Sequence, residues 1–477
     1  MELDFDRCYG AVQSKDERFD GWFITAVKTT GIYCRPSCPA VTPKRANVRF
    51  FRTAAAAHDA GFRACKRCRP DAAPGSPEWN LRADLVGRAM RLIADGVVDR
   101  DGVGGLAARL GYSERHVHRQ LVTELGAGPQ AIARAQRAQT ARLLVESTSL
   151  PFSDVAFAAG FSSIRQFNDT IRAVFARTPT ELRKLRRGAQ TAPAGMTLRL
   201  PYRAPFAEDT LAFLGTRCIP GVESYGGRTY ARSLPLPHGA GIVELTPADG
   251  HVACALWLDD LRDLTAAVQR CRSLLDLDAD PVAVAEHLGR DTSLRPFVRD
   301  APGRRIPGTT DPFELAVRAI LGQQVSVAGA RTLAGRLVEA RGKPLTTPSG
   351  GITHLFPVPD ALADADLAEV GMPEARRRAL RALAAAVADG DLVLDRGASR
   401  ADAAAALRAL PGIGPWTASY VAMRALGDPD VFLAGDLGVR KAAARLGLPD
   451  RPKDLEAHSQ RWRPWRSYAV LHLWGSL

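Results

Sequence analysis

The spacing of hydrophobic and polar positions changes along the chain, and these changes divide it into segments of different secondary structure. Apolar residues recur at helical spacing through 82–187, where short glycine-containing turns separate the runs. Residues 196–260 carry short Val, Leu, Tyr and Thr runs, which are typical of strands. From about residue 280 the helical spacing returns. The pattern therefore predicts an α+β chain.

Two small-residue stretches that contain Pro and Gly, 71–78 and 188–195, predict linkers between these segments. The chain has 477 residues, whereas a single core rarely grows beyond about 250 residues. We therefore expect a multidomain protein.

Basic charge is concentrated in the first part of the chain. Residues 1–190 contain 30 Lys and Arg against 19 Asp and Glu, whereas residues 191–477 contain 34 against 32. Such an excess favours DNA as a partner, because neutralising each phosphate releases condensed counterions. A basic surface that serves only solubility is the alternative.

Membrane association is not expected from the sequence. No apolar run approaches the length of about 18 residues that marks a transmembrane helix. The first six residues are acidic, unlike the basic start of a secretory signal. We expect a cytoplasmic, nucleoid-associated protein.

Four of the eight cysteines form two close pairs, Cys34-x3-Cys38 and Cys65-x2-Cys68. This spacing favours one tetrahedral zinc ion, although an iron–sulfur cluster stays open as an alternative. Basic residues crowd the pairs and would suit a phosphate backbone, with Arg45 and Arg67 as candidate DNA contacts: Lys28, Arg35, Lys44, Arg45, Arg49, Arg63, Lys66, Arg67 and Arg69.

Two helix-turn-helix patterns follow, at 105–125 and 153–176. In each, a glycine turn precedes a serine that can cap the second helix, at Ser113 and Ser163. The pair resembles the AraC-type DNA-binding domain, although a helical domain that binds protein is the alternative. Candidates for DNA contact on the two second helices are Glu114, Arg115, His118 and Arg119, and Ser163, Arg165, Gln166 and Asn168.

The run Leu-Pro-Gly-Ile-Gly-Pro-Trp-Thr-Ala at 410–418 predicts a helix-hairpin-helix. Gly412 and Gly414 would let backbone N–H groups approach a DNA phosphate at a helix N-terminus, without sequence preference. By itself the motif predicts only a non-specific DNA anchor.

The cysteine pairs lie in a sequence that resembles the N-terminal domain of the Ada alkylation-response regulators. The resemblance rests on Thr-Thr-Gly-Ile-Tyr-Cys-Arg-Pro-Ser-Cys at 29–38 and Gly-Phe-Arg-Ala-Cys-Lys-Arg-Cys at 61–68. It implies that Cys34, Cys38, Cys65 and Cys68 hold zinc, and that Cys34 accepts a methyl group from DNA methylphosphotriesters. A zinc knuckle that only holds the fold is the alternative.

Residues from about 196 to 477 closely resemble the AlkA-type 3-methyladenine DNA glycosylases of the helix-hairpin-helix superfamily. Besides the hairpin, the segments 319–326, 431–437 and 463–468 carry the resemblance. It implies an extruded nucleotide whose base stacks on aromatic rings. The corresponding pocket residues would be Trp416, Tyr420, Trp474, Gln323 and Gln324. Gln324 adds a polar side chain there, which leaves the base preference open.

Asp436 would be the catalytic carboxylate in this resemblance, stabilising positive charge on the sugar and orienting or activating water. Asp428 and Asp430 lie nearby, and an aspartate near a helix start is commonly only a cap. Superfamily members that also cut the strand have a lysine where Trp416 stands. The resemblance therefore implies a monofunctional glycosylase that leaves an abasic site.

With both resemblances, the fold class becomes a multidomain α+β chain with four expected domains. These are a small Ada-like zinc-binding methyl-acceptor domain (1–75), an all-α AraC-type double helix-turn-helix domain (82–187), a strand-rich AlkA N-terminal subdomain (196–285) and a helix-hairpin-helix glycosylase domain (286–477).

The sequence thus predicts a bifunctional protein in which methylation of Cys34 activates transcription and Asp436 excises N-alkylated purines such as 3-methyladenine. Its expected partners are alkylated DNA, promoter DNA and RNA polymerase. No Pro-Cys-His-Arg acceptor motif is present, so O6-methylguanine repair is not expected and Cys218, Cys254 and Cys271 are predicted core thiols. Two alternatives stay open: a regulatory protein with a non-catalytic C-terminal region, and a glycosylase whose N-terminal pieces only tether it to DNA.

Overall fold

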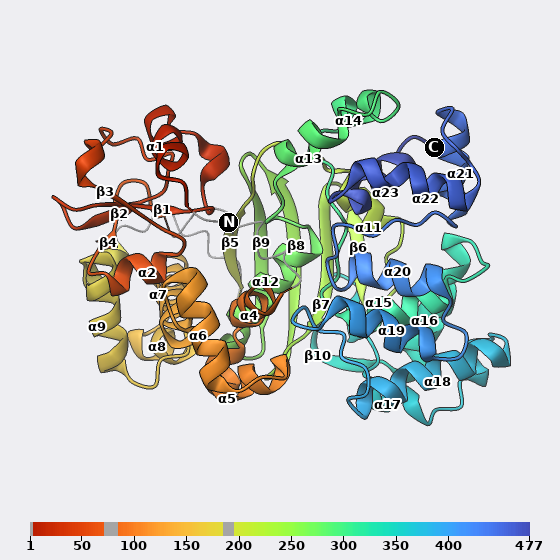
Figure 1. Cartoon of the computed structure of the whole chain (residues 1–477). Helices are drawn as coiled ribbons and strands as arrows, with labels where there is room; N and C mark the ends of the chain where they lie inside the picture. The colour runs from red at the N-terminus through yellow and green to blue at the C-terminus, as the bar shows by residue number, and fades with distance from the viewer. Residues whose placement is uncertain (1–2, 71–83, 185–194) are drawn as a thin grey trace. The chain divides into compact units, whose positions relative to one another are not determined.

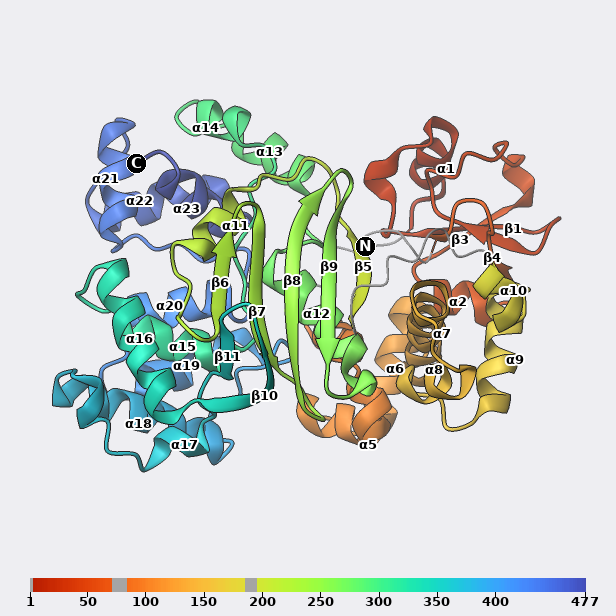
Figure 2. The same cartoon turned by 180° about the vertical axis from the view of Figure 1, so that it is seen from behind.

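The computed structural model describes residues 3–70, 84–184 and 195–477, and the chain separates into two compact units (Figure 1 and Figure 2). The first unit comprises Met1–Tyr202, Leu236–Gly239 and Ala253–Gln269. The second unit comprises Arg203–Pro235, Ala240–Val252 and Arg270–Leu477.

The first unit begins with a four-stranded sheet in the order β3-β1-β2-β4. Its strands are β1 (Ile24–Val27), β2 (Ile32–Cys34), β3 (Val48–Phe51) and β4 (Arg63–Ala64), and its helices are α1 (Phe5–Ser14) and α2 (Ala54–Asp59). β2 and β4 are parallel, and the Cys65 N–H donates to the Tyr33 carbonyl at 2.9 Å. This pairing brings the ends of two strands together, so that the two cysteine pairs meet.

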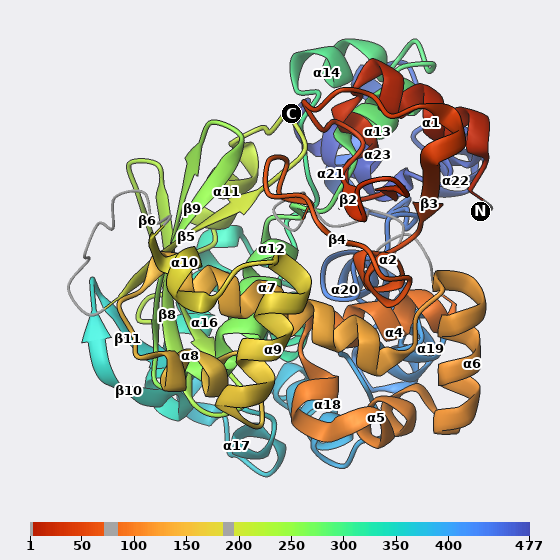
Figure 3. The same ribbon diagram turned by 90° about the vertical axis from the view of Figure 1, so that its left-hand side faces the viewer.

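The next part of the first unit is helical (Figure 3). Its helices are α4 (Leu85–Ala94), α5 (Val97–Leu110), α6 (Glu114–Leu125), α7 (Pro129–Ser147), α8 (Phe152–Ala158), α9 (Ile164–Phe175) and α10 (Pro179–Lys184). Gly111 ends α5 with φ of +78°, and Ser113 and Ser163 cap α6 and α9 with their side chains. The two predicted helix-turn-helix units, α5–α6 and α8–α9, are therefore present.

A five-stranded sheet has the order β5-β9-β8-β7-β6. Its strands are β5 (Met196–Pro201), β6 (Glu223–Gly226), β7 (Thr229–Pro235), β8 (Ala240–Ala248) and β9 (His251–Leu258). β7 pairs antiparallel with both β6 and β8, and its five central residues are buried. The strands predicted between 196 and 260 are confirmed.

The remaining elements are mainly helices. Those after residue 280 are as the sequence predicts, whereas α11 lies inside the segment predicted to form strands, because its short turn of helix carries no long periodic pattern. They are α11 (Asp209–Gly215), α12 (Leu264–Leu274), α13 (Pro281–Leu288), α14 (Arg295–Asp300), α15 (Pro312–Leu321), α16 (Val327–Arg341), α17 (Asp360–Ala363), α18 (Glu374–Ala388), α19 (Arg400–Ala409), α20 (Pro415–Arg424), α21 (Leu437–Arg445), α22 (Pro452–Ser459) and α23 (Arg466–Trp474). A core of buried Leu, Val, Ile and Ala side chains joins α15, α16, α18, α19 and α20. This core fixes the α19–α20 hairpin.

The helical prediction after residue 280 misses one β-hairpin. β10 (Lys343–Ser349) and β11 (Ile352–Leu355) pair antiparallel around Gly350 and Gly351, whose φ values are +56° and +83°. Almost all of β10 is exposed, so it lacks the alternation of buried and exposed side chains that marks a strand in a sequence. The adjacent glycines, which adopt left-handed φ without strain, were the available signal.

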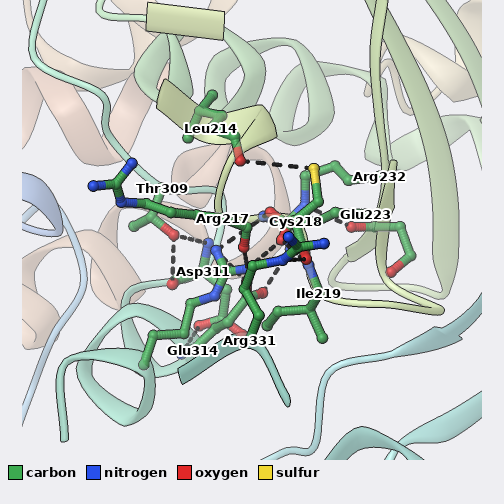
Figure 4. A network of polar contacts seen from close by, with 12 residues as sticks. Leu214, Arg217, Cys218, Ile219, Glu223, Arg232, Thr309, Asp311, Glu314 and Arg331 are labelled. Atoms are coloured by element: carbon green, nitrogen blue, oxygen red, sulfur yellow. Dashed lines mark hydrogen bonds and ion pairs between the residues drawn. The ribbon is translucent and has the colours of Figure 1, made fainter. Parts of the chain in front are cut away.

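A buried ionic network joins β6 and β7 to α15 in the second unit (Figure 4). Arg232 Nη2 donates to Glu314 Oε2 at 2.5 Å, and its Nη1 lies 3.4 Å from Glu223 Oε1. Arg318 pairs with Glu223 and lies 3.5 Å from Glu314. The two arginines balance the two glutamates, which lets four charges leave water without an uncompensated charge.

A second polar cluster should make stability depend on pH. Burial raises the pKa of Asp276 to about 6, although Arg305 and a hydrogen bond from Tyr468 Oη at 2.7 Å oppose the shift. Between pH of about 4 and 6 the Asp276 carboxyl stays protonated in the folded state, whereas it loses its proton in the unfolded state. The free energy of unfolding therefore falls as the pH rises through this range, by about 3 kcal/mol in all.

Because Asn resembles the protonated acid, Asp276→Asn should gain about 3 kcal/mol relative to wild type between pH 4 and 7. Melting temperatures of both proteins across this range measure the difference. A difference in melting temperature that stays constant from pH 4 to 7 would show that Asp276 does not titrate in this range.

Within the three described ranges, none of the helices combines the length and the apolar character that crossing a membrane requires.

Candidate functional site

Four cysteine sulfurs gather where β2 and β4 end. The Sγ atoms of Cys34, Cys38, Cys65 and Cys68 all lie within 4.8 Å of one another. A tetrahedral zinc with Zn–S bonds of about 2.3 Å would hold its sulfurs about 3.8 Å apart, so the cluster fits this ion. Cys65 and Cys68 are buried, whereas Cys34 and Cys38 keep part of their surface exposed. Cys34 and Cys38 are therefore the pair that is open to solvent.

A buried aspartate that the sequence analysis did not single out holds the Cys34–Cys38 turn. The Asp20 carboxylate accepts hydrogen bonds from Ser37 N at 3.0 Å and Ser37 Oγ at 2.7 Å, and it lies 3.1 Å from Arg35 Nη1. An isolated aspartate outside the cysteine pairs gives no local signal of this contact. Asp20 thus holds Arg35 and Ser37, which both lie in the turn between Cys34 and Cys38.

The two arginines predicted as DNA contacts near the cysteines differ in availability. Arg67 is exposed. Arg45 is paired with Asp6 and lies 4.8 Å from the Phe5 ring centroid. Arg45 would have to leave Asp6 in order to bind a phosphate, whereas Arg67 needs no such change.

The candidate contacts on α6 and α9 lie on exposed faces. Glu114, Arg115, His118 and Arg119 are exposed, as are Ser163, Arg165 and Gln166, whereas Asn168 is half-buried. The Gln166 side-chain oxygen accepts a hydrogen bond from Ser162 Oγ at 3.0 Å, and Arg165 lies 3.9 Å from Asp169. Both second helices therefore present polar side chains to solvent, and individual base contacts stay predictions.

Asp436 both caps α21 and faces two tryptophans. Its Oδ1 accepts hydrogen bonds from Val439 N at 2.8 Å and from Trp474 Nε1 at 2.9 Å. Its Oδ2 accepts one from Trp416 Nε1 at 3.0 Å. The cap that the sequence analysis treated as an alternative is therefore real, and the same carboxylate is also held between two indoles.

The competing aspartates have other partners. Asp430 is paired with Arg466 at 2.8 Å and with Arg463 at 2.9 Å. Asp428 accepts a hydrogen bond from Asp430 N at 3.0 Å and lies 3.9 Å from Arg400. Of the three, Asp436 is the one that contacts the predicted aromatic residues.

Phe213, Trp416, Tyr420 and Trp474 form an aromatic cluster beside Asp436. The Trp416 and Tyr420 rings stack with centroids 5.1 Å apart, and the Tyr420 and Trp474 centroids are 6.4 Å apart. Phe213, from α11, stacks on Trp474 at 6.4 Å with 14° between the planes. The sequence analysis missed Phe213, which stands more than 200 residues before the other three and belongs to no motif.

The two glutamines predicted near the base lie at the end of α15. Gln323 Nε2 donates to the Gly412 carbonyl at 3.0 Å and to Thr417 Oγ1 at 3.1 Å, so it braces the hairpin. Gln324 is exposed and has a left-handed φ of +55°. Gly412 has φ of +76°, and Gly414 caps α20. A contact of either glutamine with a base stays a prediction.

Models of four protein families match consecutive parts of the chain. They are the metal binding domain of Ada (7–71), a helix-turn-helix domain (106–185), the AlkA N-terminal domain (197–311) and the HhH-GPD superfamily base excision DNA repair protein (317–467). Through its helix-turn-helix and glycosylase parts the protein binds DNA.

A full-length relative decides the family. The chain is 60% identical, over 482 residues, to the probable bifunctional transcriptional activator/DNA repair enzyme AlkA of Mycobacterium tuberculosis H37Rv. This match covers 100% of this chain and 97% of the relative. The chain belongs to this AlkA family. It also shares 37% identity over 269 residues with the DNA-3-methyladenine glycosylase 2 of Escherichia coli K12, which covers 55% of this chain and 91% of that protein.

A solved structure shares the fold of more than half of this AlkA-family chain. The 3-methyladenine DNA-glycosylase from Archaeoglobus fulgidus superimposes with a TM-score of 0.52 at 23% identity, over 58% of this chain and 97% of that one. The α+β fold class and the fusion of Ada, helix-turn-helix and glycosylase parts are therefore as predicted.

Three of the four cysteines outside the cluster are predicted to be core thiols. Cys218, Cys254 and Cys271 are buried, and burial raises the pKa of Cys218 to about 12. A thiol with so high a pKa is a poor nucleophile, since the thiolate is the reactive form. Their placement agrees with the expectation of core thiols.

Gly438 lets Trp474 approach Asp436, which gives a testable prediction. A Cβ at residue 438 would lie 3.1 Å from Asp436 Oδ1 and 3.2 Å from Trp474 Cδ1, closer than these atoms pack comfortably. Gly438→Ala should therefore displace the indole and lower the single-turnover rate of base excision by about tenfold. Since alanine favours helices, stability should not fall. An unchanged rate would contradict this role. Gly447→Ala would not be a suitable control, because the left-handed φ of +66° at Gly447 would strain an alanine by itself.

Proposed function

We propose that this protein excises N-alkylated purines such as 3-methyladenine from DNA by monofunctional hydrolysis at Asp436. One observation carries the proposal: both oxygens of the Asp436 carboxylate accept indole N–H groups, from Trp416 and Trp474, within the aromatic cluster. Aromatic faces attract a cationic alkylated purine more than a neutral base. A carboxylate among them stands where positive charge develops on the sugar.

The reaction begins with a nucleotide extruded from the duplex. The bond between sugar C1′ and the purine nitrogen breaks, and its electron pair moves to the purine. Asp436 stabilises the positive charge left on the sugar and orients the water, whose oxygen bonds to C1′ while one of its protons passes to solvent; the alkylated purine leaves as a neutral molecule. Trp416 stands directly after the hairpin, and an indole cannot form an imine with the sugar, so the product is an abasic site.

We also propose that Cys34 irreversibly accepts a methyl group from a DNA methylphosphotriester. Zinc, when bound by the four cysteines, keeps their sulfurs deprotonated. The Cys34 sulfur bonds to the methyl carbon while the carbon–oxygen bond breaks, and the electron pair stays on the phosphate oxygen. The thiolate becomes a neutral thioether, so the site loses one negative charge and repels the DNA backbone less.

Tighter DNA binding after methylation would support transcription activation. We assign the methyl acceptor to residues 1–75 and promoter recognition to residues 82–187. Excision belongs to residues 196–285 together with 286–477. The residues that would contact the promoter are Arg115, Arg119, Arg165 and Gln166. RNA polymerase is the partner expected in activation, and alkylated DNA and promoter DNA are the two DNA partners.

Base release from methylated duplex DNA tests the glycosylase part. Full-length protein should release 3-methyladenine and leave abasic sites, without strand breaks before alkali treatment. DNA binding without any base release would instead support a regulatory protein whose C-terminal region is not catalytic.

Peptide mass spectrometry tests the methyl transfer. After incubation with methylphosphotriester DNA, Cys34 should carry one added methyl group, and metal analysis should find one zinc per chain. Cys34→Ala should lose both the label and the promoter response. Methylation of a different cysteine would contradict the proposal, and an unchanged promoter response would indicate that the N-terminal part only tethers the enzyme.

A further inference from the structure

Two guanidinium groups adjoin the aromatic cluster. The Cζ atom of Arg217 lies 3.6 Å from the Phe213 ring centroid. The Cζ atom of Arg424, at the end of α20, lies 5.0 Å from the Phe213 centroid and 5.4 Å from the Tyr420 centroid. Both cations thus contact rings of the cluster that surrounds Asp436.

Within the described part of the chain, neither guanidinium has a carboxylate within ion-pair distance. Arg424 is 5% exposed and donates to neutral acceptors, the carbonyls of Pro307 at 2.6 Å and Gly308 at 3.2 Å and the hydroxyl of Tyr420. Arg217 Nη1 donates to the Phe213 carbonyl at 3.0 Å and to Thr216 Oγ1 at 2.9 Å. Since guanidinium stays protonated in proteins, both positive charges persist beside the rings.

The two glutamates of the buried ionic network are already neutralised by arginines. Arg318 donates to the Arg217 carbonyl at 3.1 Å, and the same guanidinium pairs with Glu223 and lies 3.5 Å from Glu314. Burial lowers the pKa of Arg217, and the charges of Arg424 and Arg318 lower it further, whereas Tyr420 opposes the shift. The field at the aromatic cluster on this side is therefore positive.

A positive field acts differently on two kinds of leaving base. An N-alkylated purine is cationic before the C1′–N bond breaks and leaves as a neutral molecule. An uncharged purine receives the same electron pair and leaves as an anion. Fixed positive charges therefore disfavour the bound cationic base and stabilise the departing anion.

The Tyr420 hydroxyl can add a hydrogen bond to this effect. Its oxygen accepts from Arg424 Nη1, so its single proton is left for another acceptor. The adjacent guanidinium polarises this O–H, which makes it a stronger donor to a purine that gains negative charge.

We propose that Arg217 and Arg424 set the base specificity of the excision reaction, raising the rate for uncharged purines relative to cationic ones. This inference rests on the proposed glycosylase function. The C1′–N electron pair passes to the purine, Tyr420 donates a hydrogen bond to it, and water supplies hydroxide to C1′ and a proton to the released base.

Second-order rate constants for excision of hypoxanthine and 7-methylguanine, from single-turnover rates at subsaturating protein on otherwise identical duplexes, test the proposal. The first base is uncharged and the second is cationic, and these rates include the binding step in which the cation is disfavoured. Arg217→Gln should lower the ratio of the hypoxanthine rate to the 7-methylguanine rate by about tenfold, since the variant removes one charge but keeps an amide donor. Arg217→Lys, which keeps the charge, should leave the ratio within about threefold of wild type.

Tyr420→Phe gives a second measurement that keeps the ring, and it should also slow hypoxanthine release more than 7-methylguanine release. An unchanged ratio in Arg217→Gln, or wild-type release of 7-methylguanine without hypoxanthine, would overturn the inference while leaving the glycosylase function intact. Release of neither base by wild type would overturn the glycosylase function itself.

Discussion

Asp436→Asn is expected to lower the single-turnover rate of 3-methyladenine release by at least about 100-fold. The amide lacks the negative charge that opposes the developing positive charge on the sugar. Its NH2 group would also face an indole N–H, because Trp416 and Trp474 both donate to the carboxylate. Rates from full-length protein in excess over methylated DNA measure the effect.

The fold should survive this substitution, since asparagine is as good an N-cap as aspartate. Asp428→Asn is the matched control, because Asp428 lies eight positions earlier and does not contact the aromatic cluster. The control should excise at close to the wild-type rate. Equal rates for Asp436→Asn and wild type would remove Asp436 from the chemistry.

Arg232→Met should destabilise the second unit by about 3–5 kcal/mol. The substitution leaves Glu314 without its 2.5 Å partner, and Glu223 then depends on Arg318 alone. Glu223, Arg232 and Glu314 are all buried, so the remaining carboxylates would carry uncompensated charge away from water. Urea unfolding followed by tryptophan fluorescence measures the loss.

Arg228→Met tests whether the effect comes from burial of the pair. Arg228 precedes β7 by one residue and pairs with Glu208, but its side chain is 61% exposed. Exposed pairs contribute little to stability, so the unfolding midpoint should hardly change. A similar shift in both variants would show that the buried network has no special weight.

Local features of this protein could be predicted from the sequence because each depends on neighbouring residues. The two cysteine pairs specify a metal cluster, since each pair supplies two ligands from one short turn. Gly111 and Ser113 specify the turn and cap between α5 and α6 through their own backbone and side chain. The family resemblance added the functional register, including the choice of Asp436.

Other features depend on residues that are far apart in the chain. Phe213 joins Trp474, and Arg424 joins Phe213, only because α11 packs beside α20 and α23. The exposed β10 strand lacks an alternating pattern because no core covers it.

The sequence by itself therefore determined the order of the matched parts, the four-cysteine cluster and the motifs, all of which are encoded within short stretches. Only the tertiary structure decided which charges are buried together and that Phe213 joins the rings beside Asp436. The physical reason is that a buried ion pair or a ring contact stabilises the fold through proximity in space, and proximity between distant segments leaves no pattern in either one alone.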